Sequence, residues 1–142
     1  MPMVVCDLDG TLLNSAGEVS ARTRAALREV CRAGWPLLLS TARPVRHTRP
    51  VVDAIDHEMV AVCGNGSITY DFGRERIVDY RPIPKAGLRE TLASLREAHP
   101  QMRLGAECEL ELVLEEGFAL AGPEPGSPWR TPTPTCWRPP TW

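Results

Sequence analysis

Two aspartates, Asp7 and Asp9, follow directly after a short apolar run at residues 3–6. Residues two apart on an extended backbone point to the same side, so both carboxylates would face one way while Leu8 faces the other. One carboxylate can then attack an electrophile while its neighbour moves a proton. This division of labour suits phosphoryl transfer through a covalent aspartyl phosphate, with a divalent cation offsetting the negative charge.

Two other roles compete for this acidic pair. A lone aspartate after a strand usually caps a turn, but the second carboxylate and the Gly-Thr that follows it favour the catalytic role. A calcium-binding loop would use Asp7, Asp9 and Glu18 as its first, third and twelfth residues. Its sixth residue must be glycine, where this chain has Leu12, and an apolar strand replaces the entering helix. The calcium loop is therefore excluded.

Polar residues also follow the next two apolar runs along the chain. Thr41 offers a hydroxyl and, with Ala42, backbone N–H groups to a phosphoryl oxygen, although capping of a helix is an equally good role for this threonine. Asn65 and Gly66 form a step that is usually only a turn. In open α/β sheets, ligands bind at the carboxyl ends of the strands, so we expect these residues to share one edge with the acidic pair.

The elements that must position these side chains alternate between strand and helix. Apolar runs at 3–6, 36–40 and 59–63 suit buried strands, and a helix from the N-cap Ser20 to Gly34 separates the first two. Because Pro50 interrupts the next helical segment, we expect that helix to be short, over 51–55. This alternation predicts an α/β fold with a doubly wound, Rossmann-like parallel sheet, of which this chain holds a part.

After Gly66 the pattern changes to that of a smaller α+β region. The expected elements are a hairpin of 68–70 and 76–80 turned by Gly73, an amphipathic helix over 85–98, and further strands at 102–104 and 109–114. We therefore divide the chain into part of a core at 1–66, an incomplete cap at 67–120 and a tail at 121–142. The tail is rich in Pro and Trp and has no apolar period, which predicts disorder.

Composition excludes several classes of function. The 142 residues can hold one core, and the net charge of −2 without any block of like charge disfavours nucleic-acid and membrane-surface partners. The chain has no apolar run of the roughly 20 residues that a membrane span needs, so we expect a cytoplasmic protein. Its five cysteines include no Cys-x-x-Cys pair, which disfavours zinc and disulfides.

Three segments resemble the haloacid dehalogenase superfamily, in its Cof-type sugar-phosphate phosphatase subgroup. Residues 4–13, VVCDLDGTLL, resemble its first motif, and residues 39–44, LSTARP, resemble the second, with Ala42 where the subgroup usually has glycine. Residues 62–71, VCGNGSITYD, are similar to the passage from the third core strand into a cap. The resemblance covers residues 3–118.

The resemblance implies a phosphatase that uses Mg²⁺ and acts on small phosphorylated metabolites. Asp7 would be the nucleophile and Asp9 the general acid and base, and the metal would contact the Asp7 carboxylate and the Asp9 backbone carbonyl. The other implied ligand contacts are Thr41 and Ala42 at the phosphate, and Arg43, Asn65 and Gly66 at the rest of the substrate.

Two later elements of the family do not occur in this sequence. The family pairs a lysine with the phosphate and completes its metal site with an acidic Gly-Asp-Gly-x-Asn-Asp-like loop. Here the only lysine is Lys85, in no matching context, and the last aspartate is Asp79. Loss of one preorganised donor costs roughly 10² to 10³ in rate, so we expect little or no activity from this chain alone. The alternative is a non-catalytic pseudoenzyme fragment that binds a phosphorylated ligand or a partner.

The same departures suggest a hypothesis about the gene and one about association. The abrupt tail resembles an out-of-frame translation, so the chain is interpreted as a truncated or frameshifted member of the family. Complete members place the first strand in the middle of the sheet. In this chain that strand would become an exposed edge, through which self-association is possible.

Overall fold

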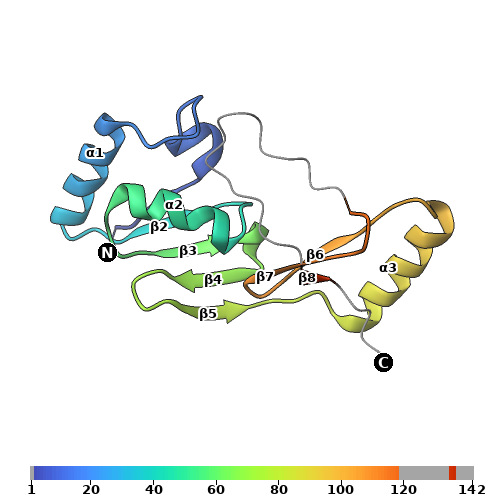
Figure 1. Ribbon diagram of the computed structural model, residues 1–142. Coiled ribbons are helices and arrows are strands. Elements are labelled where there is room, and N and C mark those ends of the chain that lie inside the picture. Colours follow the sequence, from blue (N-terminus) through green and yellow to red (C-terminus); the bar gives the residue numbers. More distant parts are fainter. Residues whose placement is uncertain (1, 119–134, 137–142) are drawn as a thin grey trace. The chain divides into compact units, whose positions relative to one another are not determined.

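The computed structural model describes residues 2–118 and 135–136 (Figure 1). The chain forms two compact units, Met1–Arg81 and Pro82–Trp142. Within the described ranges, none of the helices combines the length and the apolar character that crossing a membrane requires.

The first unit is built on a five-stranded sheet with the order β1-β2-β3-β4-β5. Three parallel strands come first: β1 (Val4–Cys6), β2 (Leu37–Ser40) and β3 (Val60–Cys63). The hairpin of β4 (Ile68–Asp71) and β5 (Arg76–Tyr80) then adds two antiparallel strands. The α/β class is therefore confirmed, and the hairpin extends the parallel strands into a mixed sheet.

Helix α1 (Ala21–Arg32) begins and ends where its capping residues predict. The Thr23 N–H donates to Ser20 Oγ at 3.1 Å, which satisfies one of the free donors at the start of the helix. Gly34 follows the last turn with φ of 74°, a left-handed conformation that glycine adopts without steric cost. Leu27 is the buried residue of this helix.

Helix α2 (Val45–Ile55) is longer than the sequence predicts, because Pro50 does not interrupt it. Proline in a helix removes one hydrogen bond and costs about 3 kcal/mol. Here Pro50 lies on the exposed side, while five residues on the opposite side are buried: Val45, Thr48, Val51, Val52 and Ile55. We attribute the longer helix to the burial of this face, which outweighs the lost bond.

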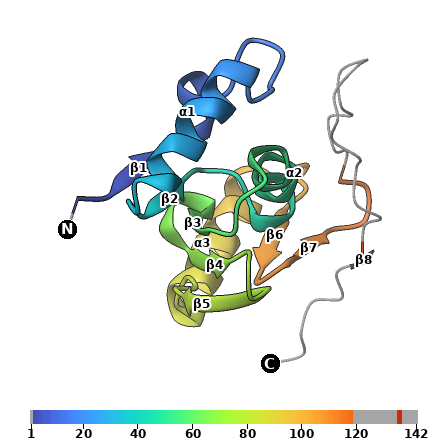
Figure 2. The ribbon, with the colours of Figure 1, turned by 90° about the vertical axis from the view of Figure 1, so that its left-hand side faces the viewer.

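Both helices cover the same face of the sheet (Figure 2). Residues that alternate along β2 and β3 show this: Leu37, Leu39, Ala61 and Cys63 are buried. The Cys63 thiol lies 3.6 Å from Thr48 Oγ1 of α2, so α2 packs on the face that Cys63 occupies. The intervening residues Leu38, Val60 and Val62 lie on the other face and are only half-buried.

The hairpin turn differs from its prediction in one detail. The residue with a left-handed backbone is Glu75, with φ of 52°, rather than Gly73. Asp71 organises the turn instead, because its Oδ1 accepts hydrogen bonds from the N–H groups of Gly73 at 3.1 Å and Arg74 at 2.9 Å. An aspartate that bonds the backbone two and three residues later is a common turn former.

The second unit contains helix α3 and a small sheet of strands β6, β7 and β8. Helix α3 (Lys85–Ala98) has the predicted bounds, whereas β6 (Gly105–Cys108) begins after the predicted strand at 102–104. Strand β7 (Glu111–Leu114) pairs antiparallel with β6 and parallel with β8 (Thr135–Cys136). No residue of α3 is buried.

The compact units divide after the hairpin rather than before it, because β4 pairs with β3 along its whole length. The predicted boundary at residue 66 assigns the hairpin to the cap rather than to the core, and this assignment stays a prediction. Of the predicted disordered tail, Thr135–Cys136 are described as β8, and the remainder lies outside the described residues.

Candidate active site

The segment after β1 forms a tight turn over Leu8–Leu12, which Asp7 caps at its start and which contains Asp9. Asp7 Oδ1 accepts a hydrogen bond from the Leu8 N–H at 2.7 Å, and the Leu13 N–H closes the turn on the Leu8 carbonyl at 2.9 Å. Leu8 and Leu12 are buried, which anchors the turn, while Asp7 and Asp9 are exposed. Both carboxylates therefore lie in solvent at the carboxyl end of β1.

The segment after β2 is organised by Thr41, which is 5% exposed. Its N–H donates to the Val62 carbonyl at 2.9 Å, and its Oγ1 accepts from the Arg43 N–H at 3.1 Å. The N-cap of α2 is Pro44, so the role of helix cap that competes for Thr41 is wrong. Its hydroxyl instead shapes a short turn that presents Ala42 to solvent.

The segment after β3, Gly64–Gly66, is attached to the β2 segment by backbone hydrogen bonds. The Gly64 N–H donates to the Arg43 carbonyl at 3.0 Å, and the Asn65 N–H donates to the Thr41 carbonyl at 3.4 Å. Gly64 has φ of 57°, and a Cβ there would lie 2.5 Å from Ser67 Oγ. Glycine adopts this left-handed conformation without steric cost, whereas a larger residue would also require the Ser67 side chain to move. The Gly64–Gly66 turn thus holds the ends of two strands together.

An ion pair joins the β1 turn to the β2 segment. Arg43 Nε donates to Asp9 Oδ2 at 2.7 Å, and a second guanidinium nitrogen donates to Asp9 Oδ1. Two parallel bonds of this kind fix both groups in one orientation. The hydrogen bonds and the charge of Arg43 outweigh partial burial and hold the pKa of Asp9 below its ordinary value.

The structure thus brings most of the predicted residues to one edge of the sheet. Asp9, Thr41, Arg43 and Asn65 are connected by hydrogen bonds, and Ala42 and Gly66 belong to the same two segments. Asp7 lies at the end of β1, whose Cys6 pairs with Leu39 of β2. Sequence patterns place Arg43 here but give no signal that its partner is Asp9.

Few side chains at this edge are available to hold a metal ion. Across residues 2–118 and 135–136, no group of three or more His, Cys, Asp or Glu side chains is arranged to bind one. The Asp9 carboxylate is held by Arg43, which leaves the exposed Asp7 carboxylate and the Asp9 backbone carbonyl. Such oxygens suit Mg²⁺, which keeps several water ligands and needs only one or two carboxylates.

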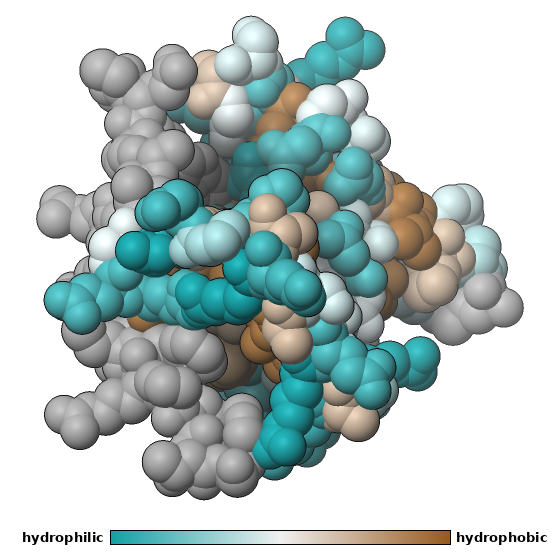
Figure 3. All heavy atoms as spheres, turned by 90° about the vertical axis from the view of Figure 1, so that its right-hand side faces the viewer, coloured by the Kyte–Doolittle hydropathy of each residue, from teal (hydrophilic) through white to brown (hydrophobic). Residues whose placement is uncertain are grey.

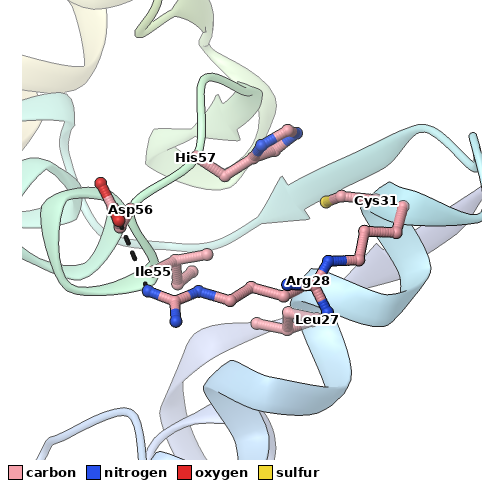
Figure 4. Close-up of a pocket in the computed structure, with 7 residues that line it drawn as sticks. Leu27, Arg28, Cys31, Ile55, Asp56 and His57 are labelled. Atoms are coloured by element: carbon pink, nitrogen blue, oxygen red, sulfur yellow. Dashed lines mark hydrogen bonds and ion pairs between the residues drawn. The ribbon is translucent and has the colours of Figure 1, made fainter.

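A cavity of about 290 Å³ lies between α1 and the end of α2 (Figure 4). Its lining includes Leu27, Cys31 and Ile55, and Arg28 bridges to Asp56 across a nitrogen-to-oxygen distance of 3.4 Å. Because Asp56 and the adjacent His57 precede β3, the cavity lies toward the amino ends of the strands. It is therefore distinct from the site formed at their carboxyl ends.

Comparison with known proteins identifies the family. The model of the haloacid dehalogenase-like hydrolases matches residues 4–118. The chain therefore belongs to this family, and the predicted resemblance, including the Cof-type subgroup, is confirmed.

Curated relatives include two phosphatases. The chain is 28% identical to pyridoxal phosphate phosphatase YbhA of Escherichia coli (strain K12) over 97 residues, which are 68% of this chain and 36% of the relative. It is 32% identical to phosphatase YwpJ of Bacillus subtilis (strain 168) over 71 residues, 50% of this chain and 25% of the relative. The chain therefore spans well under half the length of both proteins.

Solved structures agree on the fold. A haloacid dehalogenase-like hydrolase from B. subtilis superposes with a TM-score of 0.64 at 25% identity, covering 80% of this chain and 39% of that one. A haloacid dehalogenase-like hydrolase from Bacteroides thetaiotaomicron gives a TM-score of 0.68 at 23% identity, covering 82% and 44%. The arrangement of strands and helices described above is thus that of the family.

Proposed function

We propose that the site at the carboxyl ends of β1, β2 and β3 hydrolyses phosphate monoesters of small metabolites. Membership of the haloacid dehalogenase-like hydrolases and the phosphatase relatives support this activity. The proposal for this chain rests on the convergence of Asp9, Thr41 and Arg43. Hydrogen bonds connect these three residues across the ends of two neighbouring strands. Carboxylates, a hydroxyl and a guanidinium are the groups that phosphoryl transfer needs.

In the proposed reaction Asp7 is the nucleophile. Its exposed carboxylate attacks phosphorus, the bond from phosphorus to the leaving oxygen breaks, and Asp9 gives that oxygen a proton. Water then attacks the aspartyl phosphate while Asp9 takes a proton from it, which releases inorganic phosphate and restores Asp7. For this role the Asp9 carboxylate must leave its ion pair with Arg43 and take up a proton, because that pair otherwise keeps it ionised. The turn after β1 presents both Asp7 and Asp9 to solvent.

The neighbouring segments would bind the phosphoryl group and the rest of the substrate. The Thr41 hydroxyl can donate its hydrogen to a phosphoryl oxygen while its oxygen accepts from Arg43, and the exposed Ala42 adds a backbone donor. Arg43, Asn65 and Gly66 border this position and are proposed to contact the substrate.

Mg²⁺ is the cofactor that we propose, held by the Asp7 carboxylate and the Asp9 backbone carbonyl. When bound, it would neutralise charge between the phosphate and the nucleophile. With only two protein ligands, we expect weak binding. We therefore expect slow turnover or none from this polypeptide by itself. The cytoplasmic location expected from the sequence also stays a prediction.

The test is release of p-nitrophenol from p-nitrophenyl phosphate, with and without Mg²⁺. Any turnover should fall at least a hundredfold in Asp7→Asn, which keeps the shape of the side chain but removes the nucleophile. Asp53→Asn changes an exposed carboxylate of α2 and should leave the rate unchanged. A wild-type rate in Asp7→Asn would refute the assignment of the nucleophile.

A binding measurement separates a weak enzyme from a non-catalytic binder. If turnover is absent, calorimetry with inorganic phosphate should still detect binding that Arg43→Ala weakens and Arg28→Ala does not, since Arg28 lies at the separate cavity. This outcome would support the pseudoenzyme alternative. Absence of both turnover and phosphate binding would reject both functions for this chain.

A further inference from the structure

The cavity between α1 and the end of α2 has an apolar floor. Leu27 of α1 is 5% exposed and Ile55 of α2 is 1% exposed, and the half-buried Cys31 lies beside them in the lining. Figure 4 shows the Cys31 thiol pointing from α1 toward the space between the helices. A floor of this kind offers a ligand close packing but few hydrogen bonds, so it suits an apolar group.

Two opposite charges face each other at the rim of the cavity. Arg28 extends from α1 toward Asp56, and the closest nitrogen and oxygen atoms are 3.4 Å apart (Figure 4). This distance is longer than the roughly 2.8 Å of a strong hydrogen bond between ions. The Arg28 and Asp56 side chains are 48% and 81% exposed, so the pair is weak. Each group can therefore exchange its partner for an ion of a ligand at little cost.

The charge of the lining is balanced. A second arginine, Arg32, also borders the cavity, but it is paired with Glu29 one turn earlier on α1. This leaves Arg28 as the cation and Asp56 as the anion that face a ligand. A ligand with a single charge would be attracted by one of them and repelled by the other, whereas a zwitterion satisfies both.

The walls of the cavity are fixed before any ligand binds. The Ala33 N–H donates to the Glu29 carbonyl at 2.9 Å at the end of α1, and the Asp56 N–H donates to the Val52 carbonyl at 3.0 Å at the end of α2. The whole lining comes from these two helices and the turn before β3, within the first unit. A pre-formed cavity loses little conformational freedom when a ligand binds.

The size of the cavity limits the ligand. Pockets for small molecules measure about 300 to 1,000 Å³, and this cavity, at about 290 Å³, lies at the lower end. It suits a molecule of amino-acid size rather than a nucleotide. Cys31, Asp56 and His57 all line the cavity, but within residues 2–118 and 135–136 no three such side chains are arranged to bind a metal ion.

The cavity also differs from the exposed apolar surface of the first unit. Apolar atoms gather on the flank that carries β1, on the right in Figure 3, where Met3 and Val5 are 56% and 49% exposed. Residues 3–6 carry no charged side chain. The cavity, in contrast, combines an apolar floor with a cation and an anion, and it can therefore distinguish between ligands of equal hydrophobicity and different charge.

We propose that this cavity binds an apolar α-amino acid of about the size of leucine. Its carboxylate binds Arg28, and its ammonium group binds Asp56. Its side chain packs against Leu27 and Ile55. The two charged groups of an α-amino acid are attached to the same carbon atom, so they reach two protein charges only where these lie close together, as Arg28 and Asp56 do. Each protein ion exchanges a loose partner for a closer one, and the net charge of the site does not change.

The first test compares ligands by calorimetry on the full chain at low salt. L-leucine should bind with a Kd of about 1 mM or below, as expected for a small ligand with few contacts. Three analogues each lack one group: 4-methylpentanoate has no ammonium group, 3-methylbutylamine has no carboxylate, and glycine has no side chain. Each should bind about tenfold more weakly or worse, because one of the three contacts is lost.

The second test changes the two charged residues one at a time. Arg28→Gln and Asp56→Asn should each raise the Kd for L-leucine about tenfold or more. Asparagine tolerates the left-handed backbone of Asp56, where φ is 60°, so this variant keeps the end of α2. Arg22→Gln on α1 and Asp53→Asn on α2 change exposed charges outside the lining and should leave the Kd unchanged.

The Asp56→Asn variant also gives a readout that a general loss of stability would not produce. Without its anion, the cavity should no longer prefer L-leucine to 4-methylpentanoate. Circular dichroism checks the fold of each variant, and the ligand series on the wild type decides the question if a variant does not fold.

Three results would overturn the proposal. L-leucine could release no heat and cause no thermal shift at concentrations up to about 10 mM. It could bind no more tightly than 4-methylpentanoate, which would indicate a site for apolar anions. Finally, Arg28→Gln and Asp56→Asn could both bind L-leucine as the wild type does, which would place the ligand elsewhere.

Discussion

The two compact units both combine helices with strands, but they bury apolar side chains very unequally. Of the apolar residues that are buried in the described part of the chain, all except Leu114 belong to the first unit. Helix α3 has the same amphipathic spacing as α1, yet its leucines at 88, 92 and 95 are only half-buried. Amphipathic spacing therefore predicts a helix, but a core requires a surface for that helix to cover.

The units also differ in what holds their elements together. In the first unit, Leu39 of β2 and Ile55 of α2 are almost completely inaccessible to solvent and lie between sheet and helices. In the second, Glu115 connects the elements: its carboxylate accepts hydrogen bonds from Arg96 of α3 and from the Leu104 N–H before β6. We infer that the first unit depends mainly on packing and the second on polar contacts.

The largest effect expected from this difference is that of Leu39→Ala. Truncation of a fully buried leucine leaves a cavity and costs about 2–5 kcal/mol. Leu92→Ala is the matched control in α3, and its cost should stay below about 1.5 kcal/mol because the side chain is already half in solvent. Urea denaturation followed by circular dichroism measures both, and equal losses would show that the second unit has a core after all.

The next effect concerns Glu115→Ala, which removes the carboxylate that joins α3 to the strands. Hydrogen bonds to charged groups contribute about 1.5–3 kcal/mol. We expect the substitution to cost an amount at the lower end of this range, because the Arg96 side chain is 42% exposed. Amide exchange in α3 and β6 should accelerate about tenfold, while exchange in β2 and β3 should not change. Glu116→Ala, next along the chain, is the control.

A smaller loss is expected from Ser20→Ala at the start of α1. The substitution removes the acceptor of the Thr23 N–H and should cost about 1 kcal/mol. Ser15→Ala changes an exposed serine in the preceding loop and should have no measurable effect. Thermal unfolding compares the two variants, and an unchanged midpoint in Ser20→Ala would contradict the capping role.

The smallest expected effect is a change in how strongly acid lowers the thermal stability, caused by Asp71→Asn. Hydrogen bonds from the Arg74 and Gly73 N–H groups and from the Arg74 side chain hold the pKa of Asp71 below its ordinary value. The bonded carboxylate therefore stabilises the folded state above its unfolded pKa, and this contribution is lost as pH falls through its folded pKa. Thermal midpoints at pH 7 and pH 3 should differ less in Asp71→Asn than in the wild type.

Local patterns in the sequence predict local structure well. The bounds of α3 and the start of α1 follow from apolar spacing and from Ser20, because both features act within one or two turns. The start of α2 could not be predicted in this way. The cost of Pro50 is a local property, whereas the burial of Val45 and Thr48 depends on the sheet that α2 covers.

The candidate site shows the same division between local and long-range information. The positions of Asp7, Asp9 and Thr41 at the ends of strands follow from apolar runs that stop at polar residues. The pairing of Asp9 with Arg43 depends on how two strand ends lie side by side, and single-sequence patterns do not record that distance. The same limit applies to the hydrogen bonds of Gly64 and Asn65, because backbone groups have no residue-specific signal.

The bonds from Gly64 and Asn65 to the β2 segment tie the loops after β2 and β3 to each other. Opening either loop breaks these bonds, so we expect the geometry of the site to depend on the pairing of the two strands. Occupancy of the site by a ligand should therefore depend on the stability of buried residues that the ligand never touches. A polymorphism that weakens packing beneath the sheet would reduce function in proportion to the unfolded fraction, with the site residues themselves intact.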